Sequence, residues 1–450
     1  MNSPVRSKPA AAEALAFGSK ELRDQFLFDP KWLNLNHGSF GTFPKFIKER
    51  LRFYQDACEA RPDAFIRYEY PKLLDESRVA VAGLLNVPVD SVVLVSNATV
   101  GVNTVIKNLR WSPDGRDVIL TFSTIYEGCG KVVDYVVDYF EGLVSNKEIG
   151  LTYPMDDEDI IRAFRDAVKE VEAEGKRARA CIFDVVSSRP GVLFPWQGMI
   201  KACRELGVLS VVDGAQGIGM VPLDLRAADP DFFVSNCHKW LHVPRACAVF
   251  YVPERNQHLI PSSLATSHGY APRTAVRTTP LPPSSKSRFV QTFEFVGTMD
   301  NAPYLCVKDA IEWRRTVLGG EDKFLAQLWD LNKRGARLVA GRLGTEVMEN
   351  SAGTLTNCGM SNVALPIWCA PGGERAKETD TVLSAEDAQK ALQWMLSTMV
   401  EEYNTFMALF FHCGRMWARI SAQAYLGDED YSRGADVLEA LCARVAKREF

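Results

Sequence analysis

The stretch FFVSNCHKWLHVPRAC, residues 232–247, runs from an apolar, strand-like segment directly into a group of reactive side chains. Four of these are able to bind a metal ion: Cys237, His238, His242 and Cys247. The spacing argues against a structural zinc site. Such sites pair their ligands in short loops such as CxxC, whereas Cys237 and His238 are adjacent and would point to opposite sides of a strand. Burial alone explains both cysteines, since free Cys is among the most buried residue types.

Lys239 is harder to explain by packing. An ammonium at the end of an apolar strand, beside Trp240, would lose its water, and desolvation favours the neutral, nucleophilic amine. The alternative is a lysine whose stem packs on the protein while its charge stays in water. This segment by itself leaves both interpretations open.

Short β-branched runs alternate with helix-like segments from about residue 90 to residue 255. The strand-like runs are SVVLV, DVILTF, ACIFDVV, VLSVVD, DFFVSN and CAVFYV. Between the second and the third run, Ile160, Phe164 and Val168 fall on one helical stripe. This alternation is typical of βαβ units, and it predicts an α/β fold whose mostly parallel sheet is buried on both faces.

The length of 450 residues predicts two domains. We place a large domain at residues 61–304 and a smaller α+β domain at residues 305–450. The smaller domain is predicted from a helical stretch near 302–345, the strand SNVALPI, the helix SAEDAQKALQWML, a strand pair near 405–422 and a closing helix from about 428. Residues 259–290 are rich in Pro, Ser and Thr, so we expect a long loop there that acts as a lid.

The composition limits the partners of the protein. The net charge of -4 gives no basic field that would attract nucleic acid. The first 20 residues lack the apolar core of a signal peptide, and no apolar run is long enough to span a bilayer. We read the eleven Cys as reduced thiols, because they show no repeating spacing. A cytoplasmic protein without a metal site is expected.

A carboxylate precedes the lysine in the same part of the predicted sheet. LSVVDGAQGIGM places Asp213 at the carboxyl end of a buried strand, where open α/β sheets bind ligands. Lys239 follows 26 residues later, also at a strand end, so both groups can face one crevice. GAQGIG resembles a glycine-rich dinucleotide fingerprint, but its order is GxxGxG and an acid stands directly before it, which argues against that interpretation.

VVLVSNATVGVNTVIKNL supplies a third element, in which a strand ends and a helix begins near Val100. Free amides at a helix N-terminus, with Ser96 and Thr99 beside them, can hold one phosphate, although an ordinary helix cap is the alternative. Pyridoxal 5'-phosphate requires a phosphate anchor, an acid at its ring nitrogen and an amine for its aldehyde. The three elements together therefore predict a pyridoxal-phosphate site.

With these motifs in this order, the sequence resembles the fold-type I pyridoxal-phosphate enzymes of the class V aminotransferase family, from LNLNHGSFGTFP to WARISAQAYLGDEDY. That resemblance implies a mostly parallel seven-stranded sheet between helices and an N-terminal segment, residues 1–60, that packs on the active site and the small domain. It also implies a role for each matching residue. Lys239 would carry the cofactor, and Asp213 would pair with its ring nitrogen. Gln216 and Ser188 would lie by the phenolic oxygen, and Ala98 and Thr99 would hold the phosphate with Ser235 or His238. Gly297 and Thr298 would reach the phosphate of a neighbouring subunit in a homodimer.

The same resemblance implies the substrate contacts. Arg419, in ARISAQAY, would bind the substrate α-carboxylate, since a guanidinium holds both oxygens in one plane; a structural ion pair is the alternative. Asn36, His37 and Ser39, in NHGSFG, match a turn that folds over the substrate.

Two departures from the family bear on the reaction. Tyr126, in TIYEGCG, stands where most members stack a His on the cofactor. Cys358 and Cys413 lie close to predicted strands, so neither has the setting of the sulfur-accepting cysteine of a desulfurase. Both departures favour a carbon–sulfur lyase over a desulfurase. The chain also resembles the fungal lyases that act on hercynylcysteine sulfoxide in ergothioneine synthesis, in LNHGSFGTFPK, TIYEGCG and SNCHKWLHVPR. The expected reaction is β-elimination from a cysteine S-conjugate or its sulfoxide; an epimerase or aminotransferase is the alternative.

Overall fold

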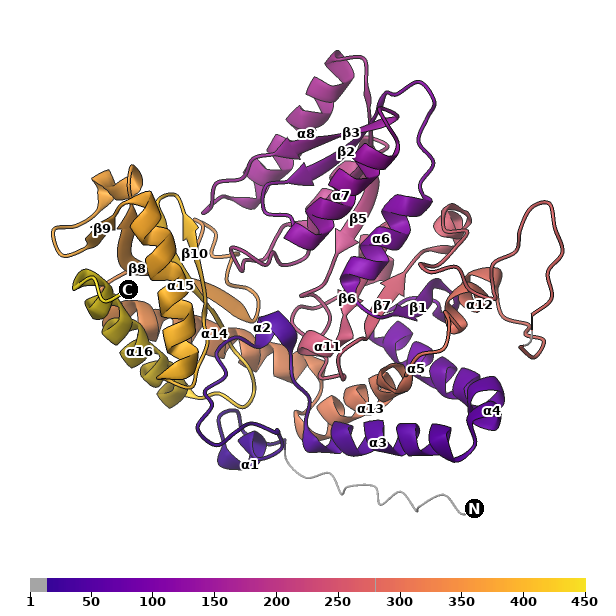
Figure 1. Ribbon diagram of the computed structural model, residues 1–450, viewed down its shortest axis with the longest axis horizontal. Coiled ribbons are helices and arrows are strands. Elements are labelled where there is room, and N and C mark those ends of the chain that lie inside the picture. The colour runs from indigo at the N-terminus through magenta and orange to yellow at the C-terminus, as the bar shows by residue number, and fades with distance from the viewer. Residues whose placement is uncertain (1–13, 280) are drawn as a thin grey trace.

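The computed structural model describes residues 14–279 and 281–450 and contains two β-sheets with helices around them (Figure 1). The larger sheet has the strand order β1-β7-β6-β5-β4-β2-β3. Its strands are β1 (Val92–Val95), β2 (Asp117–Phe122), β3 (Val144–Ile149), β4 (Arg177–Asp184), β5 (Leu209–Asp213), β6 (Phe232–Asn236) and β7 (Ala248–Tyr251). All neighbours are parallel except β7, which is antiparallel to β1 and β6. The predicted α/β fold and its mostly parallel seven-stranded sheet are confirmed.

Both faces of this sheet are buried, as the apolar runs predict. Alternate residues of a strand point to opposite faces, so Val211 lies in one hydrophobic cluster and Val212 in the other. The principal helices around the sheet are α3 (Lys45–Ala60), α5 (Tyr70–Leu84), α6 (Ala98–Asn108), α7 (Glu127–Tyr139), α8 (Asp157–Ala173), α9 (Trp196–Glu205) and α13 (Ala302–Val317). Helices α6 and α7 share the cluster of Val211, whereas α8 and α9 share that of Val212.

The smaller sheet has the order β10-β11-β8-β9. Its strands are β8 (Met360–Cys369), β9 (Thr381–Leu383), β10 (Ala408–His412) and β11 (Arg415–Ser421), and its helices are α14 (Glu321–Leu343), α15 (Ala385–Glu401) and α16 (Asp428–Ala446). The helical stretch predicted near 302–345 is two helices, because Gly319 and Gly320 both adopt positive φ angles between them. Helix α13 packs on α3 and α5, and α14 packs on β8 and α16, so the chain passes between the two sheets at about residues 318–320.

The N-terminal segment lies against the smaller sheet and its flanking residues. Arg23 forms an ion pair of 3.1 Å with Asp430, and Leu33 pairs with Thr405 in an isolated bridge. The short helix α2 (His37–Phe40) then contacts α11 (Cys237–Trp240), the turn that carries Lys239. The described part of the predicted segment 1–60 thus joins the C-terminal region to the end of β6; residues 1–13 lie outside the described residues.

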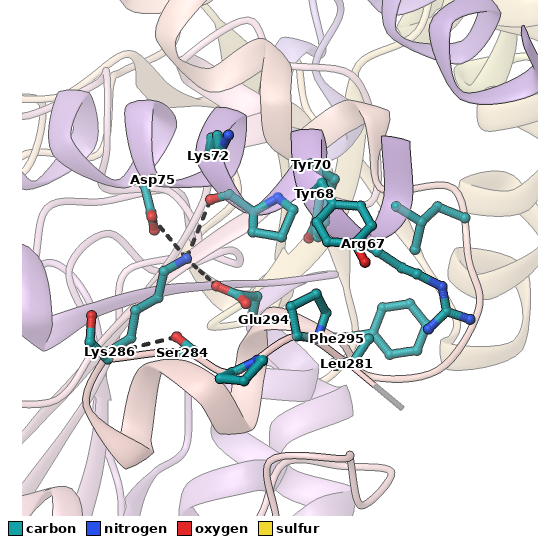
Figure 2. A pocket seen from close by; sticks show the side chains of 15 residues that line it. Arg67, Tyr68, Tyr70, Lys72, Asp75, Leu281, Ser284, Lys286, Glu294 and Phe295 are labelled. Atoms are coloured by element: carbon teal, nitrogen blue, oxygen red, sulfur yellow. Dashed lines mark hydrogen bonds and ion pairs between the residues drawn. The ribbon is translucent and has the colours of Figure 1, made fainter. Parts of the chain in front are cut away.

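Residues 260–279 and 281–287 contain no helix or strand. Of the loop predicted at 259–290, residue 259 ends a short 3₁₀ helix and residues 288–290 begin an α-helix. In Figure 1 the loop projects beside α12 (Arg288–Glu294), away from β8 to β11. A cavity of about 300 Å³ lies between this loop and the chain around Tyr70. Figure 2 shows side chains that line it, among them Lys286, which contacts Glu294 and Asp75. The lid function assigned to residues 259–290 stays a prediction.

No helix in the described part of the chain is both long and apolar enough to cross a membrane. Among the same residues, no group of three or more His, Cys, Asp or Glu side chains is arranged to hold a metal ion. Cys237 and Cys247, the two thiols of the opening motif, are fully buried beside β6 and β7.

Candidate active site

Lys239 lies in α11, which begins where β6 ends. Its neighbours hold this turn in place: Trp240 is fully buried and donates from Nε1 to Gln216 Oε1 at 2.6 Å, and His238 Nδ1 pairs with the carbonyl of Cys247 at 2.9 Å. Within the described residues the amine of Lys239 makes no hydrogen bond. Burial lowers the pKa of Lys239 to about 8, although the nearby Asp213 opposes this shift. The amine is therefore more nucleophilic at neutral pH than that of an exposed lysine.

Asp213 ends β5, the strand next to β6, and only 3% of its surface is exposed. Its Oδ1 accepts a hydrogen bond of 2.9 Å from the amide of Ala215, and its Oδ2 accepts one of 3.3 Å from the thiol of Cys129. Burial raises the pKa of Asp213, whereas these two hydrogen bonds and the charge of Lys239 lower it. Each carboxylate oxygen keeps a lone pair for a further donor, such as a protonated ring nitrogen.

A second carboxylate lies beside Asp213 that the sequence analysis missed. Asp184 ends β4 and is the register partner of Asp213 across two parallel strands. It is 8% exposed and makes no hydrogen bond or ion pair with a described residue. Burial, followed by the charge of Asp213, raises the pKa of Asp184 well above its usual range. The sequence pattern that could have identified Asp184 is the apolar run ACIFDVV, in which an acid stands where the strand ends. The same pattern identified Asp213.

The start of α6 meets the end of β6 at the predicted phosphate anchor. Asn97 caps the helix by accepting from the amide of Val100 at 2.9 Å. The amide of Ala98 already donates to Asn236 Oδ1 at 2.8 Å, while that of Thr99 has no acceptor among the described residues. The amide and hydroxyl of Thr99 are therefore available to a phosphate. Ala98 instead fixes the start of the helix to the end of β6.

Two other residues predicted near the phosphate are engaged in the protein. Ser235 is fully buried, donates from its hydroxyl to the carbonyl of Gly214 and accepts from the amide of Ile218 at 2.9 Å. It thus holds the loop that follows Asp213. His238 uses Nδ1 toward the protein and keeps Nε2 available; burial lowers its pKa to about 4.

Gln216 and Ser188 lie on two sides of the site. The amide of Gln216 donates from Nε2 to the carbonyl of Gly38 at 2.7 Å, and its oxygen accepts from Trp240. Gln216 therefore ties the N-terminal turn to the lysine turn. The carbonyl of Ser188 accepts from Arg419 at 2.6 Å, and its hydroxyl lies 3.3 Å from the same nitrogen.

Arg419, on β11, is a buried cation with no carboxylate partner among the described residues. It is 2% exposed, and its Nη2 donates to Asn36 Oδ1 at 2.9 Å and to Ser39 Oγ at 2.8 Å. Its Nε is buried and has no hydrogen-bond acceptor in the part of the chain that the structure describes. Burial, and secondly the charge of Arg189, lowers the pKa of Arg419 to about 10. A buried charge left uncompensated in this way is costly, and it indicates a binding place for an anion.

His37 has a different place from Asn36 and Ser39. Its Nε2 lies 2.8 Å from the main-chain oxygen of Lys239 and its Nδ1 lies 3.1 Å from the hydroxyl of Tyr425. Burial lowers the pKa of His37 to about 3, so the ring is neutral. Both ring nitrogens contact other parts of the protein. This geometry indicates that His37 holds the lysine turn in place, rather than contacting the substrate as predicted.

Tyr126 and the pair Gly297–Thr298 are the most exposed of the predicted residues. Tyr126 precedes α7 and is 48% exposed, and its phenol makes no hydrogen bond to a described residue. Cys129, three residues further on, contacts Asp213, which places the start of α7 at the same edge of the sheet. Gly297 and Thr298 are exposed in the turn after α12, and Thr298 lines a small cavity with Phe65. They take no part in the site of this chain.

The residues present fit pyridoxal phosphate on three observations. A lysine amine of lowered pKa makes no hydrogen bond to a described residue, a buried Asp lies on the neighbouring strand, and a helix start offers an unpaired amide. Lys239 would hold the aldehyde carbon, Asp213 the ring nitrogen and Thr99 the phosphate.

Comparisons with known proteins agree with this assignment. The model of the class-V aminotransferase family matches residues 152–279. The L-cysteine desulfhydrase-like protein lolT1 of Epichloe uncinata is 32% identical, over 98% of this chain and 99% of that protein. The hercynylcysteine sulfoxide lyase of Schizosaccharomyces pombe is 28% identical, over 94% of this chain and 97% of that protein. Among solved structures, a mutant of C-DES with glycine covalently linked to its pyridoxal-phosphate cofactor matches with a TM-score of 0.73 at 17% identity, covering 93% of this chain and 98% of that one.

These findings define an enzyme of the fold-type I group that depends on pyridoxal phosphate. The chain belongs to the class V aminotransferase family.

Gly41 offers a test of how tightly the N-terminal turn packs on the lysine turn. Its φ angle is +62°, and a Cβ there would lie 2.0 Å from the carbonyl oxygen of His238. We expect Gly41→Ala to lower the free energy of unfolding by about 2 kcal/mol or more, because backbone on both sides must move. Gly83→Ala, where nothing lies within 4 Å on α5, should leave stability unchanged or raise it by about 0.5–1 kcal/mol. Urea denaturation of the two variants tests this, and equal stabilities would contradict the packing described.

The lowered pKa of Lys239 predicts how cofactor-free protein responds to pH. Only the neutral amine attacks an aldehyde, so the rate of attachment of pyridoxal phosphate should rise with pH, reach half its maximum near pH 8 and level off above. An unperturbed lysine, measured as Nα-acetyl-lysine in the same buffers, should keep rising toward the ordinary value of 10.5. Stopped-flow absorbance gives both profiles, and a midpoint for the protein above about pH 10 would contradict the desolvated amine.

Proposed function

We propose that this enzyme cleaves the carbon–sulfur bond of a cysteine S-conjugate or its sulfoxide by β-elimination, releasing a thiol or sulfenate, with pyruvate and ammonia formed after hydrolysis. The observation that carries the proposal is the buried Arg419 guanidinium, which lacks an anion among the described residues and lies close enough to Lys239 to lower its pKa. An amino-acid carboxylate there would place the substrate Cα near the lysine amine.

The residues of the chain have separate tasks in this reaction. Bound pyridoxal phosphate supplies an electron sink that makes the Cα hydrogen acidic. Lys239 removes that proton with Nζ, and Asp213 keeps the ring nitrogen protonated. Arg419, fixed by Asn36 and Ser188, orients the α-carboxylate so that the Cα–H bond faces the amine.

Tyr126 is the proposed donor to the departing sulfur. Its phenol is exposed at the edge of the sheet that carries Asp213 and has no hydrogen-bond partner in the described part of the chain. A hydroxyl there can hydrogen-bond or protonate a sulfur leaving group, whereas the reaction of an epimerase has no such group to stabilise. The relatives named as a desulfhydrase-like protein and a sulfoxide lyase support this direction.

For the particular substrate, we propose hercynylcysteine sulfoxide, and thereby a step of ergothioneine synthesis. The support is the match along nearly the whole length of the Schizosaccharomyces pombe lyase. The test is pyruvate release from a panel of hercynylcysteine sulfoxide, the corresponding thioether, S-methylcysteine sulfoxide and cysteine. Absence of pyruvate from every member would exclude the lyase, and a preference for cysteine itself would exclude the proposed substrate only.

A second candidate function is epimerisation of an amino acid. It is favoured by the isopenicillin N epimerase of Streptomyces clavuligerus, which is 28% identical over 94% of this chain. Exchange of the Cα hydrogen with inversion, and without ammonia, would identify this activity.

We further propose a homodimer in which Gly297 and Thr298 reach the phosphate of the other copy. Both residues are exposed in the single chain, and the family resemblance implies that they reach a phosphate in the neighbouring subunit. Sedimentation of the holoenzyme tests the dimer, and a monomer at micromolar concentration would contradict it.

A further inference from the structure

Cys129 contacts Asp213, the acid of the predicted cofactor site. It lies in α7, a helix that contains none of the predicted cofactor ligands. It lies in the first turn of α7, is 1% exposed and donates from its thiol to Asp213 Oδ2 at 3.3 Å. The amide of Ala215 takes the other oxygen at 2.9 Å. The carboxyl group of Asp213 is therefore fixed at both oxygens by two segments that are 84 and 2 residues away in the sequence.

Asp184 makes such a donor necessary. It stands beside Asp213 in register, is buried and has no hydrogen-bond partner of its own among the described residues. Two adjacent buried carboxyl groups resist a second negative charge, so only one of them is ionised. The two donors to Asp213 favour its ionised form, whereas the raised pKa of Asp184 favours the protonated form of that group. The groups that favour the ionised form of Asp213 are the amine of Lys239, the amide of Ala215 and the thiol of Cys129.

The thiol can fill this role because it stays protonated. Burial, together with the charge of Asp213, raises the pKa of Cys129 far above its ordinary value. A buried thiol of this kind donates a weak hydrogen bond and does not act as a nucleophile.

We propose that Cys129 is a positioning residue that holds Asp213 oriented and ionised beside Asp184, so that Asp213 can bind the protonated ring nitrogen of pyridoxal phosphate. The inference depends on the cofactor and on no particular substrate. It can therefore hold if the proposed lyase activity fails, and it can fail if that activity is confirmed.

The test is cofactor affinity, measured by titrating cofactor-free protein with pyridoxal phosphate and following absorbance and intrinsic fluorescence. Cys129→Ala removes the donor and should raise the dissociation constant by about tenfold, the effect of one hydrogen bond to a charged group. Cys129→Ser keeps a donor and should stay within about threefold of wild type. Cys442→Ala, at a buried cysteine of α16, is the matched control and should bind like wild type.

A double-mutant cycle with Asp213→Asn separates positioning from packing. If Cys129 acts through the carboxylate, its replacement by Ala should change affinity by less than about twofold in the Asp213→Asn background, because the charged partner is gone. Equal weakening by Ala and Ser, an unchanged constant for Cys129→Ala, or full persistence of its effect in the Asp213→Asn background would each overturn the proposal. Since Cys129→Ser and wild type are compared directly, the test also stands if the Ala variant does not fold: a loss of about tenfold in the Ser variant counts against it.

Discussion

Lys239→Ala should reduce pyruvate release from a cysteine conjugate by at least about 10³-fold, because the variant lacks both the amine that binds the aldehyde and the base for the Cα proton. The cofactor should still bind through the other contacts, but without a covalent bond. Borohydride reduction followed by mass spectrometry distinguishes the two states: the wild type should retain the cofactor mass and the variant should lose it.

Lys201→Ala is the matched control, since Lys201 is exposed on α9. It should keep wild-type activity and covalent attachment. An active Lys239→Ala variant, or cofactor attached by reduction to another lysine, would refute the assignment of the site as a whole.

Arg419→Met should lower kcat/KM for an amino-acid substrate by roughly 10²–10³-fold, because a bidentate contact with a carboxylate combines two hydrogen bonds to charged groups. Arg419→Lys keeps the charge but loses the planar pair of donors, so an intermediate loss is expected. Both substitutions should change the affinity for pyridoxal phosphate much less than kcat/KM, since the guanidinium contacts none of the predicted phosphate ligands and, of the predicted cofactor contacts, only Ser188.

The control is Arg337→Met, at an exposed position of α14. It should leave both constants as in the wild type. If Arg419→Met kept normal kcat/KM, the unpaired guanidinium would have to serve another anion, and the main support for the proposed function would be lost.

In the larger sheet, the sequence predicted the strands that contain an apolar run, and it missed the strand that does not. The six apolar runs correspond to β1, β2, β4, β5, β6 and β7. Strand β3 has the sequence VSNKEI and lies at the edge of the sheet with only its two end residues buried. An edge strand needs no continuous apolar run, so no periodicity signal distinguished it from a loop.

Site residues could be predicted where one chain segment is enough to place them. Asp213 and Lys239 are at strand ends, and the carboxyl ends of neighbouring parallel strands meet at one edge. Cys129 could not be found in this way, because its contact joins residues 84 positions apart and depends on the direction of a helix. His37 was assigned from its motif alone, and its hydrogen bonds to Lys239 and Tyr425 are visible only in three dimensions.

Arg419, the proposed ligand of the substrate carboxylate, is held in place by Asn36, which lies 383 residues earlier in the chain. During synthesis Asn36, Asp213 and Lys239 all leave the ribosome before β11 does. The lysine turn and Asp213 can therefore assemble first, while the binding place for the substrate carboxylate is still incomplete. Loading with cofactor and competence for substrate should thus be separate events in the maturation of each new molecule, and only the second has to wait for the last strand.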